Sequence, residues 1–295
     1  MYNANEVNTL LSKRIGMLKF RNQAISLGHR TLIMGVVNVT PDSFSDGGQF
    51  LNPDNAITRI KTLLKSGADI IDIGGESTRP FSKPTTVKEE LDRIMPVMQK
   101  IKAENINAII SIDTRKAEVA QEALKEGAHI INDISGLNFD QNMAGVIKEY
   151  DAGVIIMHSQ GIPETMQSNP YYEDLINNIL YSLEMSVKKA LHLGISRDSI
   201  IIDPGIGFGK TLKHNLLVIK NLEKLKVLNF PIAIGVSRKA FIGEILKEKV
   251  ENRLIGTIAA SVMCIVNGAN IIRTHDVNEI KQAIKISDAI LNIEG

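Results

Sequence analysis

One six-residue pattern that recurs three times constrains the fold more than any other feature of the sequence. Its copies are GADIID at 67–72, GAHIIN at 127–132 and GANIIR at 268–273, and each follows a stretch with helical periodicity. Glycine just past a helix end favours the left-handed conformation, and the β-branched pair that follows starts a short buried strand. Each copy is therefore expected to connect a helix to a strand.

The segment before the first copy has the expected helix punctuation. Asn52 is suited to cap the helix, Pro53 to occupy its first turn, and Gly67 to end it. Between them, apolar residues recur at helical spacing and predict one buried face: Ala56, Ile57, Ile60, Leu63 and Leu64.

Five further apolar runs have the length of strands, and with the three copies they give eight: Leu32–Val37, Ala108–Ile112, Val154–Met157, Ser199–Ile202 and Pro231–Val236. Nearly continuous apolar strands that alternate with helices predict a parallel sheet covered on both faces, and eight such units close a barrel. We predict an α/β fold, a single-domain (β/α)8 TIM barrel over 31–295. A doubly wound sheet is the alternative, but no glycine-rich dinucleotide fingerprint follows the first strand.

Residues 1–30 form an N-terminal extension, in which 19–26 could make a hairpin that closes the barrel floor. The first residues, 1–14, lack the charged start and apolar run of a secretory signal. The least charged stretch, 254–272, is interrupted by Asn267, Gly268 and Asn270, which favours a buried helix and a turn over a membrane span. We therefore expect no membrane association.

Charge and cysteine content narrow the functional classes. The 34 Lys and Arg residues nearly balance the 33 Asp and Glu residues, and no basic stripe with interleaved aromatic residues is present, so a nucleic-acid partner is not expected. A single cysteine, Cys264, cannot form an intrachain disulfide and fits a reducing compartment. A cytoplasmic protein with a small-molecule substrate is expected.

Every expected strand ends in polar residues, in the order Asn38, Asp72, Asp113, Asn132, His158, Asp203, Ser237 with Lys239, and Arg273 with His275. The carboxyl ends of barrel strands form the rim that carries active sites. Part of this rim offers groups suited to the donor-rich edge of a heterocycle: Asp113, Asn132 and Asp203. Another part offers groups suited to phosphate oxygens: Asn38, Lys239, Arg273 and His275. Two long loops, 39–51 and 74–86, are expected to act as lids or binding loops.

These positions belong to motifs in which the chain resembles the dihydropteroate synthases, a family of pterin-binding TIM-barrel enzymes. The matching strings run from about residue 30 to the end: MGVVNVTPDSFSDGG (34–48), DIGGESTRP (72–80), SIDT (111–114), NDISG (132–136), DPGIGFGKT (203–211), GVSRKAFIG (235–243) and RTHDV (273–277). The resemblance implies condensation of 4-aminobenzoate with 6-hydroxymethyl-7,8-dihydropterin diphosphate, giving 7,8-dihydropteroate and pyrophosphate in folate biosynthesis.

The resemblance also implies roles for individual residues. Those that would hold the pterin are Asp113, Asn132, Asp203, Phe208, Gly235 and Lys239. Those that would hold the diphosphate are Asn38, Arg273 and His275, with Asn38 also contacting Mg²⁺. Those that would frame 4-aminobenzoate are Phe44, Thr78, Arg79, Pro80, Phe208, Ser237 and Lys239. The groups implied in the chemistry itself are Asp113, Lys239, Arg273 and His275.

The resemblance further implies a carbon–oxygen bond to diphosphate that breaks first or nearly so, followed by attack of the weakly basic aryl amine. A homodimer and competitive inhibition by sulfonamides are expected on the same ground. The chain departs from the family pattern at Ser159, where methionine is usual, and at Phe81, where glycine is usual. The first departure concerns the packing of the pocket and the second concerns the lid.

Several of these assignments have a structural alternative, and Phe44 and Phe208 could be ordinary packing residues. Asp113 and Asp203 could cap the helices that follow them. Lys239 could be solvated or form a Schiff base. Arg273 and His275 could pair with Asp276. His158 is expected to support the site without acting as a base, Asp72 and Glu76 to cap a helix or order a loop, and Cys264 to lie in the core.

Two other functions remain open at this point. A methyltetrahydrofolate methyltransferase would share the acidic pterin site but would need no diphosphate clamp. A non-catalytic pterin-binding paralogue would bind without turnover. Pyrophosphate release that depends on 4-aminobenzoate would separate both from a synthase.

Overall fold

The computed structural model describes residues 16–40, 52–77, 82–162 and 165–293. Eight parallel strands form the centre of the fold: β3 (Leu32–Asn38), β4 (Ile70–Gly74), β5 (Ile109–Asp113), β6 (Ile130–Asp133), β7 (Gly153–Met157), β8 (Ile200–Asp203), β9 (Ala233–Gly235) and β10 (Ile271–Thr274). All eight coincide with predicted strands, although β9 is shorter than the run at 231–236.

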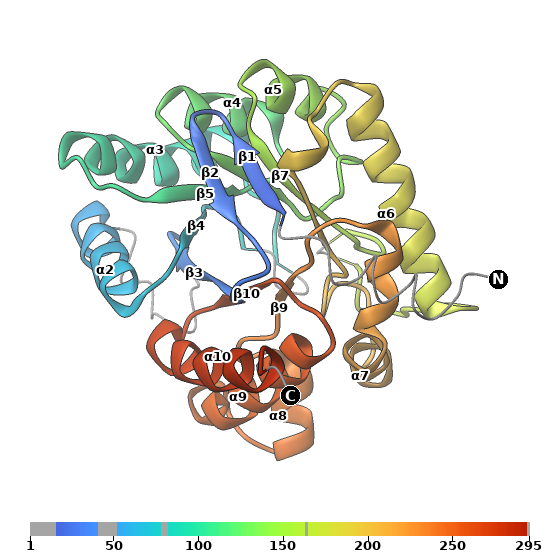
Figure 1. Cartoon of the computed structure of the whole chain (residues 1–295). Helices are drawn as coiled ribbons and strands as arrows, with labels where there is room; N and C mark the ends of the chain where they lie inside the picture. The colour runs from blue at the N-terminus through green and yellow to red at the C-terminus, as the bar shows by residue number, and fades with distance from the viewer. Residues whose placement is uncertain (1–15, 41–51, 78–81, 163–164, 294–295) are drawn as a thin grey trace.

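The strands pair in the order β8-β7-β6-β5-β4-β3-β10-β9, and the two ends of this order also meet. A parallel bridge joins Ile202 to Ile232, and Ile202 N donates to Pro231 O at 2.9 Å. The sheet therefore closes into a barrel, seen end-on in Figure 1. The predicted (β/α)8 barrel is confirmed, and the open doubly wound sheet is excluded because it would leave two strand edges unpaired.

Helices surround this ring (Figure 1): α2 (Pro53–Ser66), α3 (Val87–Ala103), α4 (Ala117–Lys125), α5 (Met143–Glu149), α6 (Leu175–His192), α7 (Leu212–Lys220), α8 (Ala240–Leu246), α9 (Leu254–Val266) and α10 (Val277–Leu291). Short 3-10 helices η2 (Arg197–Ser199), η3 (Leu222–Leu228) and η4 (Val250–Asn252) lie in the connections. Helix α2 has the predicted ends, because Asn52 accepts from Asp54 N and Gly67 ends the helix at φ 103°.

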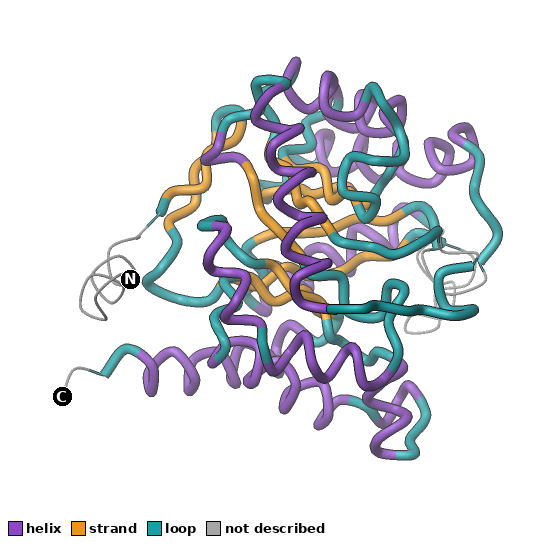
Figure 2. The backbone as a smooth tube through the Cα atoms, turned by 90° about the vertical axis from the view of Figure 1, so that its right-hand side faces the viewer, coloured by secondary structure: helices purple, strands orange, loops and turns teal. Residues whose placement is uncertain are grey.

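The hairpin of the N-terminal extension consists of β1 (Met17–Phe20) and β2 (Gln23–Ser26), so it begins before Lys19, where the prediction placed it. Figure 2 shows it at one end of the barrel strands. Leu18 and Phe20 are buried in a cluster with the first residues of several barrel strands. Ser199 Oγ donates to Lys19 O at 2.5 Å and fastens the hairpin to the barrel. The hairpin thus closes the barrel floor.

Helix α9 was predicted to be a buried helix, but only one side of it is buried. Thr257, Ser261 and Cys264 are buried, whereas Ile255 is 79% exposed. The apolar run therefore covers the barrel with one side and faces outward with the other. Within the described residues, no helix is both long and apolar enough to cross a membrane.

Candidate active site

The two-residue repeat of the strands brings the polar rim residues into the barrel mouth. Side chains alternate along a strand, so every second residue points inward. The inner apolar cluster beside the floor, together with Ile109 packed against it, takes one or two residues from every barrel strand: Leu32, Met34, Ile70, Ile109, Ile130, Ile155, Ile201, Ala233 and Ile271. Along each strand toward the mouth, the later residues with the same inward orientation include a mainly polar layer: Asn38, Asp72, Asp113, Asn132, Asp203, Gly235 and Arg273. The predicted pterin and diphosphate residues on the strands therefore face one space.

Arg273 lies at the centre of this layer. Its Nε donates to Asp72 Oδ2 at 2.6 Å, and its Nη2 donates to Asp113 Oδ2 at 2.8 Å. Asn132 Nδ2 donates to the same Asp72 oxygen at 3.2 Å. Burial alone would lower the pKa of Arg273, but Asp72 and Asp113 together hold it above its usual value. The guanidinium is therefore charged and fixed between β4 and β5.

The two carboxylates around Arg273 are incompletely satisfied. Asp72 Oδ1 and Asp113 Oδ1 are buried, and neither has a hydrogen-bond partner among the described residues. Burial raises the pKa of Asp113 to about 7, with Arg273 opposing the rise and Asp72 adding to it. A buried acceptor without a donor is costly, so the mouth is built to receive donors from a ligand.

Asp203 and Lys239 form the next part of the mouth. Asp203 Oδ1 accepts from Gly205 N at 2.7 Å, and burial raises its pKa. Lys239 Nζ donates to Ile206 O and lies 4.6 Å from the centre of the Phe208 ring. Burial lowers the pKa of Lys239 to about 8, and Asp203 opposes the decrease. The lysine therefore carries its charge near neutrality close to a carboxyl group and an aromatic face.

His275, Asn38 and Ser237 form a second polar group on the rim. His275 Nδ1 lies 3.1 Å from Ser237 Oγ, and its Nε2 lies 3.4 Å from Asn38 Nδ2. Burial, and then Arg273, lower the pKa of His275 to about 3. The imidazole is neutral; because the Asn38 amide nitrogen can only donate, Nε2 accepts and the one ring N–H is at Nδ1, facing Ser237 Oγ.

Two of the structural alternatives considered for these residues do not describe what is found, namely helix capping by the aspartates and pairing of Arg273 with Asp276. Helix α4 is capped at Lys116 and α7 at Thr211, so Asp113 and Asp203 cap neither helix. Asp276 forms its ion pair with Arg238, at 2.5 Å, and leaves Arg273 to the mouth.

Asp72 has a larger part than the capping or loop-ordering role that was expected of it. It is fully buried and contacts both Arg273 and Asn132. Its position two residues after inward-facing Ile70 is the pattern that could have placed it in the mouth.

A buried lysine was missed by sequence reasoning. Lys210 Nζ lies 2.9 Å from His158 Nδ1 and donates to Phe208 O at 3.1 Å. Burial lowers the pKa of Lys210 to about 7, and that of His158 to about 3. His158 thus supports the loop after β8, in agreement with its expected supporting role.

Four residues expected to frame 4-aminobenzoate lie outside the described residues, namely Phe44, Thr78, Arg79 and Pro80, as does Phe81. Of the two departures from the family pattern, only Ser159 is described, and its Oγ donates to Gly161 O at 3.2 Å. No group of three or more His, Cys, Asp or Glu residues in the described ranges could by itself hold a metal ion.

Comparison with known proteins agrees with this geometry. A family model described as pterin binding enzyme matches residues 34–275. The dihydropteroate synthase of Synechocystis is 45% identical over 264 residues, covering 89% of this chain and 91% of the relative. The structure of the dihydropteroate synthase of Yersinia pestis in complex with a sulfonamide drug has a TM-score of 0.90 at 38% identity, covering 94% of this chain and 100% of that chain. The Clostridium difficile dihydropteroate synthase, solved in the presence of pteroic acid, has a TM-score of 0.84 at 47% identity, covering 90% and 99%.

Proposed function

Because this chain belongs to the pterin-binding enzymes and, within them, to the dihydropteroate synthases, we propose that the barrel mouth around Arg273 is where it joins a dihydropterin to 4-aminobenzoate. The chain is a transferase of folate biosynthesis. It condenses 4-aminobenzoate with 6-hydroxymethyl-7,8-dihydropterin diphosphate and releases pyrophosphate.

One observation carries the assignment of this site. Arg273 contacts a carboxylate of the pterin group, Asp113, and is also the cation assigned to the diphosphate. A substrate with a donor-rich ring and an anionic tail needs these two kinds of group within one molecule's length of each other. Pteroic acid, a pterin joined to 4-aminobenzoate, was present in one of the similar structures, which supports these two substrate classes.

The pterin half consists of Asp113, Asn132 and Asp203, with Lys239 beside them. The carboxylates would accept from the amino and ring N–H groups of the pterin, and the Asn132 amide can both donate and accept. The buried and unpartnered Oδ1 of Asp113 is suited to this role. Gly235, which is buried and lacks a side chain, would leave room for the flat ring.

The diphosphate half consists of Asn38, Arg273 and His275. Arg273 would turn part of its guanidinium from the carboxylates to the phosphate oxygens, and the Nδ1–H of neutral His275 would turn from Ser237 Oγ to donate to them. Asn38 would contact Mg²⁺ through its amide oxygen. The amide nitrogen, Nδ2, faces His275, and the oxygen accepts no hydrogen bond from the described residues. Few protein ligands suffice when phosphate oxygens complete the shell. When bound, Mg²⁺ supplies positive charge against the diphosphate.

For 4-aminobenzoate, the described part of the site offers Phe208, Ser237 and Lys239. The Phe208 ring would pack against the aromatic ring, while Lys239 and Ser237 provide polar contacts nearby. Phe44, Thr78, Arg79 and Pro80 are assigned to the same substrate by resemblance. Sulfonamides, which resemble 4-aminobenzoate, would compete for this position, and a sulfonamide complex of a similar structure supports that expectation.

The chemistry follows from the placement of charge. The carbon–oxygen bond to diphosphate breaks and its electron pair leaves with the diphosphate, while Arg273 and His275 stabilise the departing anion. The resulting cation is delocalised into the pterin, between Asp113 and Asp203. The aryl amine then donates its lone pair to the carbon, and its N–H proton is lost to solvent. The amine is weakly basic and attacks a cation, so no strong base is required.

A homodimer and a cytoplasmic location complete the proposal. Exposed isoleucines recur along α10, with Ile286 65% and Ile290 67% exposed, and Ile255 lies on the neighbouring α9. Apolar stripes of this kind are typical of protein interfaces, and a second copy of the chain would cover them. The single cysteine, Cys264, is buried and free, which suits a reducing compartment.

The test is to measure pyrophosphate release from dihydropterin diphosphate in the presence of Mg²⁺, with and without 4-aminobenzoate. A synthase releases pyrophosphate at a rate that depends on 4-aminobenzoate and forms dihydropteroate in equal amount. A methyltransferase would release none, and a non-catalytic paralogue would bind the pterin without turnover. Either result would refute the proposal.

A further inference from the structure

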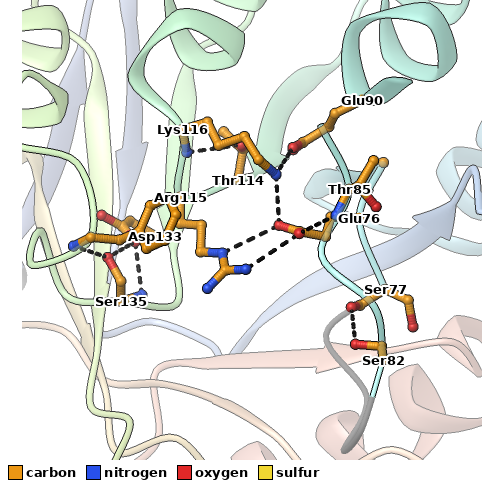
Figure 3. A network of polar contacts seen from close by, with 12 residues as sticks. Glu76, Ser77, Ser82, Thr85, Glu90, Thr114, Arg115, Lys116, Asp133 and Ser135 are labelled. Atoms are coloured by element: carbon orange, nitrogen blue, oxygen red, sulfur yellow. Dashed lines mark hydrogen bonds and ion pairs between the residues drawn. The ribbon is translucent and has the colours of Figure 1, made fainter. Parts of the chain in front are cut away.

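A buried carboxylate at the base of the β4–α3 loop contacts both sides of that loop. Glu76 lies two residues after the end of β4, and its side chain is 5% exposed. Its Oε1 accepts from Thr85 N at 2.9 Å, on the other side of the loop. Its Oε2 accepts from Lys116 Nζ at 2.9 Å (Figure 3). One side chain therefore joins the two ends of the loop to each other and to the next βα connection.

Two cations of the β5–α4 turn hold this carboxylate. Arg115 approaches with Nε 3.3 Å from Oε2 and Nη2 3.4 Å from Oε1, and Lys116 approaches from the side of Glu90 (Figure 3). Lys116 also donates to Glu90 Oε2 at 2.5 Å, so two cations face two carboxylates. Burial opposes ionisation of Glu76, but its hydrogen bonds with Lys116 and Thr85 hold its pKa below the usual value. Two cations and two carboxylates therefore meet in a buried network.

Further bonds close the stem of the loop, which consists of residues 74–77 and 82–86. Ser82 Oγ donates to Ser77 O at 2.6 Å. Arg93, on α3, donates to Gly75 O at 2.7 Å and to Thr85 Oγ1 at 3.4 Å. Among these side-chain bonds, those of Glu76 are the ones that tie the stem to the β5–α4 turn, because the bonds of Ser82 and Arg93 stay within the stem or join it to α3.

The same network borders the pterin half of the mouth. Arg115 stands two residues after Asp113, and its guanidinium also lies 4.3 Å from the centre of the Phe139 ring in the β6–α5 connection. The residues between the two sides of the stem include Thr78, Arg79 and Pro80, which resemblance assigns to 4-aminobenzoate. Ser77 and Ser82, the described residues on either side of that segment, are joined to each other in the stem.

We propose that Glu76 is a positioning residue for 4-aminobenzoate: its buried ion network fixes the stem of the β4–α3 loop relative to the strand that carries Asp113. This inference rests on the proposed function. Glu76 does not touch either substrate. Because Asp113 and Arg273 are held by other partners, the loss of Glu76 affects the aminobenzoate side of the site more than the pterin side.

Glu76→Gln tests the proposal, because the amide keeps the length of the side chain but can no longer accept from Thr85, Arg115 and Lys116 with both of its terminal atoms. The control is Glu118→Gln, the same substitution at an exposed glutamate in the first turn of α4. For each variant, KM is measured for 4-aminobenzoate at saturating dihydropterin diphosphate, and then for dihydropterin diphosphate at saturating 4-aminobenzoate. Sulfonamide inhibition constants and melting temperatures are measured alongside.

Glu76→Gln is expected to raise KM for 4-aminobenzoate and the sulfonamide inhibition constant together, by about 10-fold, because misplacing a binding segment weakens each ligand that contacts it. KM for dihydropterin diphosphate stays within about twofold, and Glu118→Gln matches the parent protein. A lower melting temperature with both KM values unchanged, or an equal rise in both, would identify Glu76 as merely structural and overturn the inference.

Ser82→Ala is the second test variant and replaces Glu76→Gln if that variant does not fold. It removes only the bond to Ser77 O and leaves the buried ions intact, so a rise in KM for 4-aminobenzoate alone, of about threefold, is expected. An unchanged value for this variant contradicts the role of the stem. If the parent protein releases pyrophosphate without any dependence on 4-aminobenzoate, the proposed function fails. If that dependence is present and the variants keep the parent KM, only the positioning role fails.

Discussion

Arg273 Nη2 donates a 2.8 Å hydrogen bond to Asp113 Oδ2, which joins β10 to β5 across the mouth of the barrel. The sequence divides the rim into an acidic group and a cationic group, and the structure brings one member of each into direct contact. A substrate that carries both a donor-rich ring and an anion can take over both halves of this pair: the ring replaces the guanidinium at the carboxylate, and the diphosphate replaces the carboxylate at the guanidinium. Binding then exchanges one set of charge interactions for another without leaving a buried charge alone.

Asp203→Asn is predicted to weaken pterin binding by about 10- to 100-fold, because a hydrogen bond to a charged acceptor contributes more than one to a neutral amide. The amide oxygen can still accept from Gly205 N, so the loop after β8 keeps its shape. Titration calorimetry with a pterin measures the loss of affinity, and thermal unfolding checks that the fold is kept. Asp92→Asn, at a largely exposed surface carboxylate, is the control. Unchanged pterin affinity in Asp203→Asn would remove Asp203 from the site.

Arg273→Ala is predicted to lower kcat by about 100- to 1,000-fold, because a preorganised charge that stabilises the leaving anion is lost. It should also cost about 3–5 kcal/mol in unfolding free energy, since the substitution leaves Asp72 and Asp113 without their cation. Denaturant unfolding and steady-state kinetics at saturating substrates measure both quantities. The double variant Arg273→Met with Asp72→Asn should recover part of the stability but not kcat. Recovery of both would mean that Arg273 acts only through folding.

Pterin affinity is predicted to pass through a maximum between about pH 7 and pH 8. The pKa of Asp113 is raised to about 7, so below this pH the group is a neutral carboxyl and accepts hydrogen bonds less well. The pKa of Lys239 is lowered to about 8, so above this pH the lysine loses its charge. Dissociation constants measured from pH 5.5 to 9.5 test this shape. Asp113→Asn should flatten the acidic limb, and Lys239→Arg should move the alkaline limb upward, since arginine stays protonated. If the pH dependence of pterin affinity is the same in the parent protein and both variants, Asp113 and Lys239 are not the groups that set it.

Ile290→Glu is predicted to shift the chain from dimer to monomer, because a charge placed in an apolar interface loses its hydration on association. The residue is 67% exposed, so folding should be unaffected. Sedimentation velocity over a range of protein concentrations measures the shift. Tyr181→Glu, at a 66% exposed aromatic residue on α6, is the matched control. A parent protein that sediments as a monomer at all concentrations would end the dimer proposal.

The elements and the inward-facing residues could be predicted from the sequence because both depend on local patterns. The GADIID-type junctions, the ends of α2 and the apolar runs mark where each helix stops and each strand starts. The two-residue repeat then decides which side of a strand faces the barrel axis, and this places Asp113, Asn132 and Asp203 in one layer. The strand ends by themselves therefore predicted a polar mouth.

The partners within that mouth could not be predicted in the same way. Asp72 was expected to cap a helix or order a loop, yet it holds Arg273, which lies 201 residues later in the chain. Glu76 was also given a local role, but its main contacts are Arg115 and Lys116 in the next connection. Nothing in the local pattern around either residue indicates these contacts.

The sequence by itself thus determined the number of units, their order and the faces that carry the chemistry, because hydrophobic periodicity and turn chemistry act over a few residues. Only the tertiary structure decided that β8 meets β9 and that Arg273 lies between Asp72 and Asp113. Closing the ring sets the distances across its mouth. Those distances depend on how all eight strands tilt and stagger together, a property that no single segment of the chain contains.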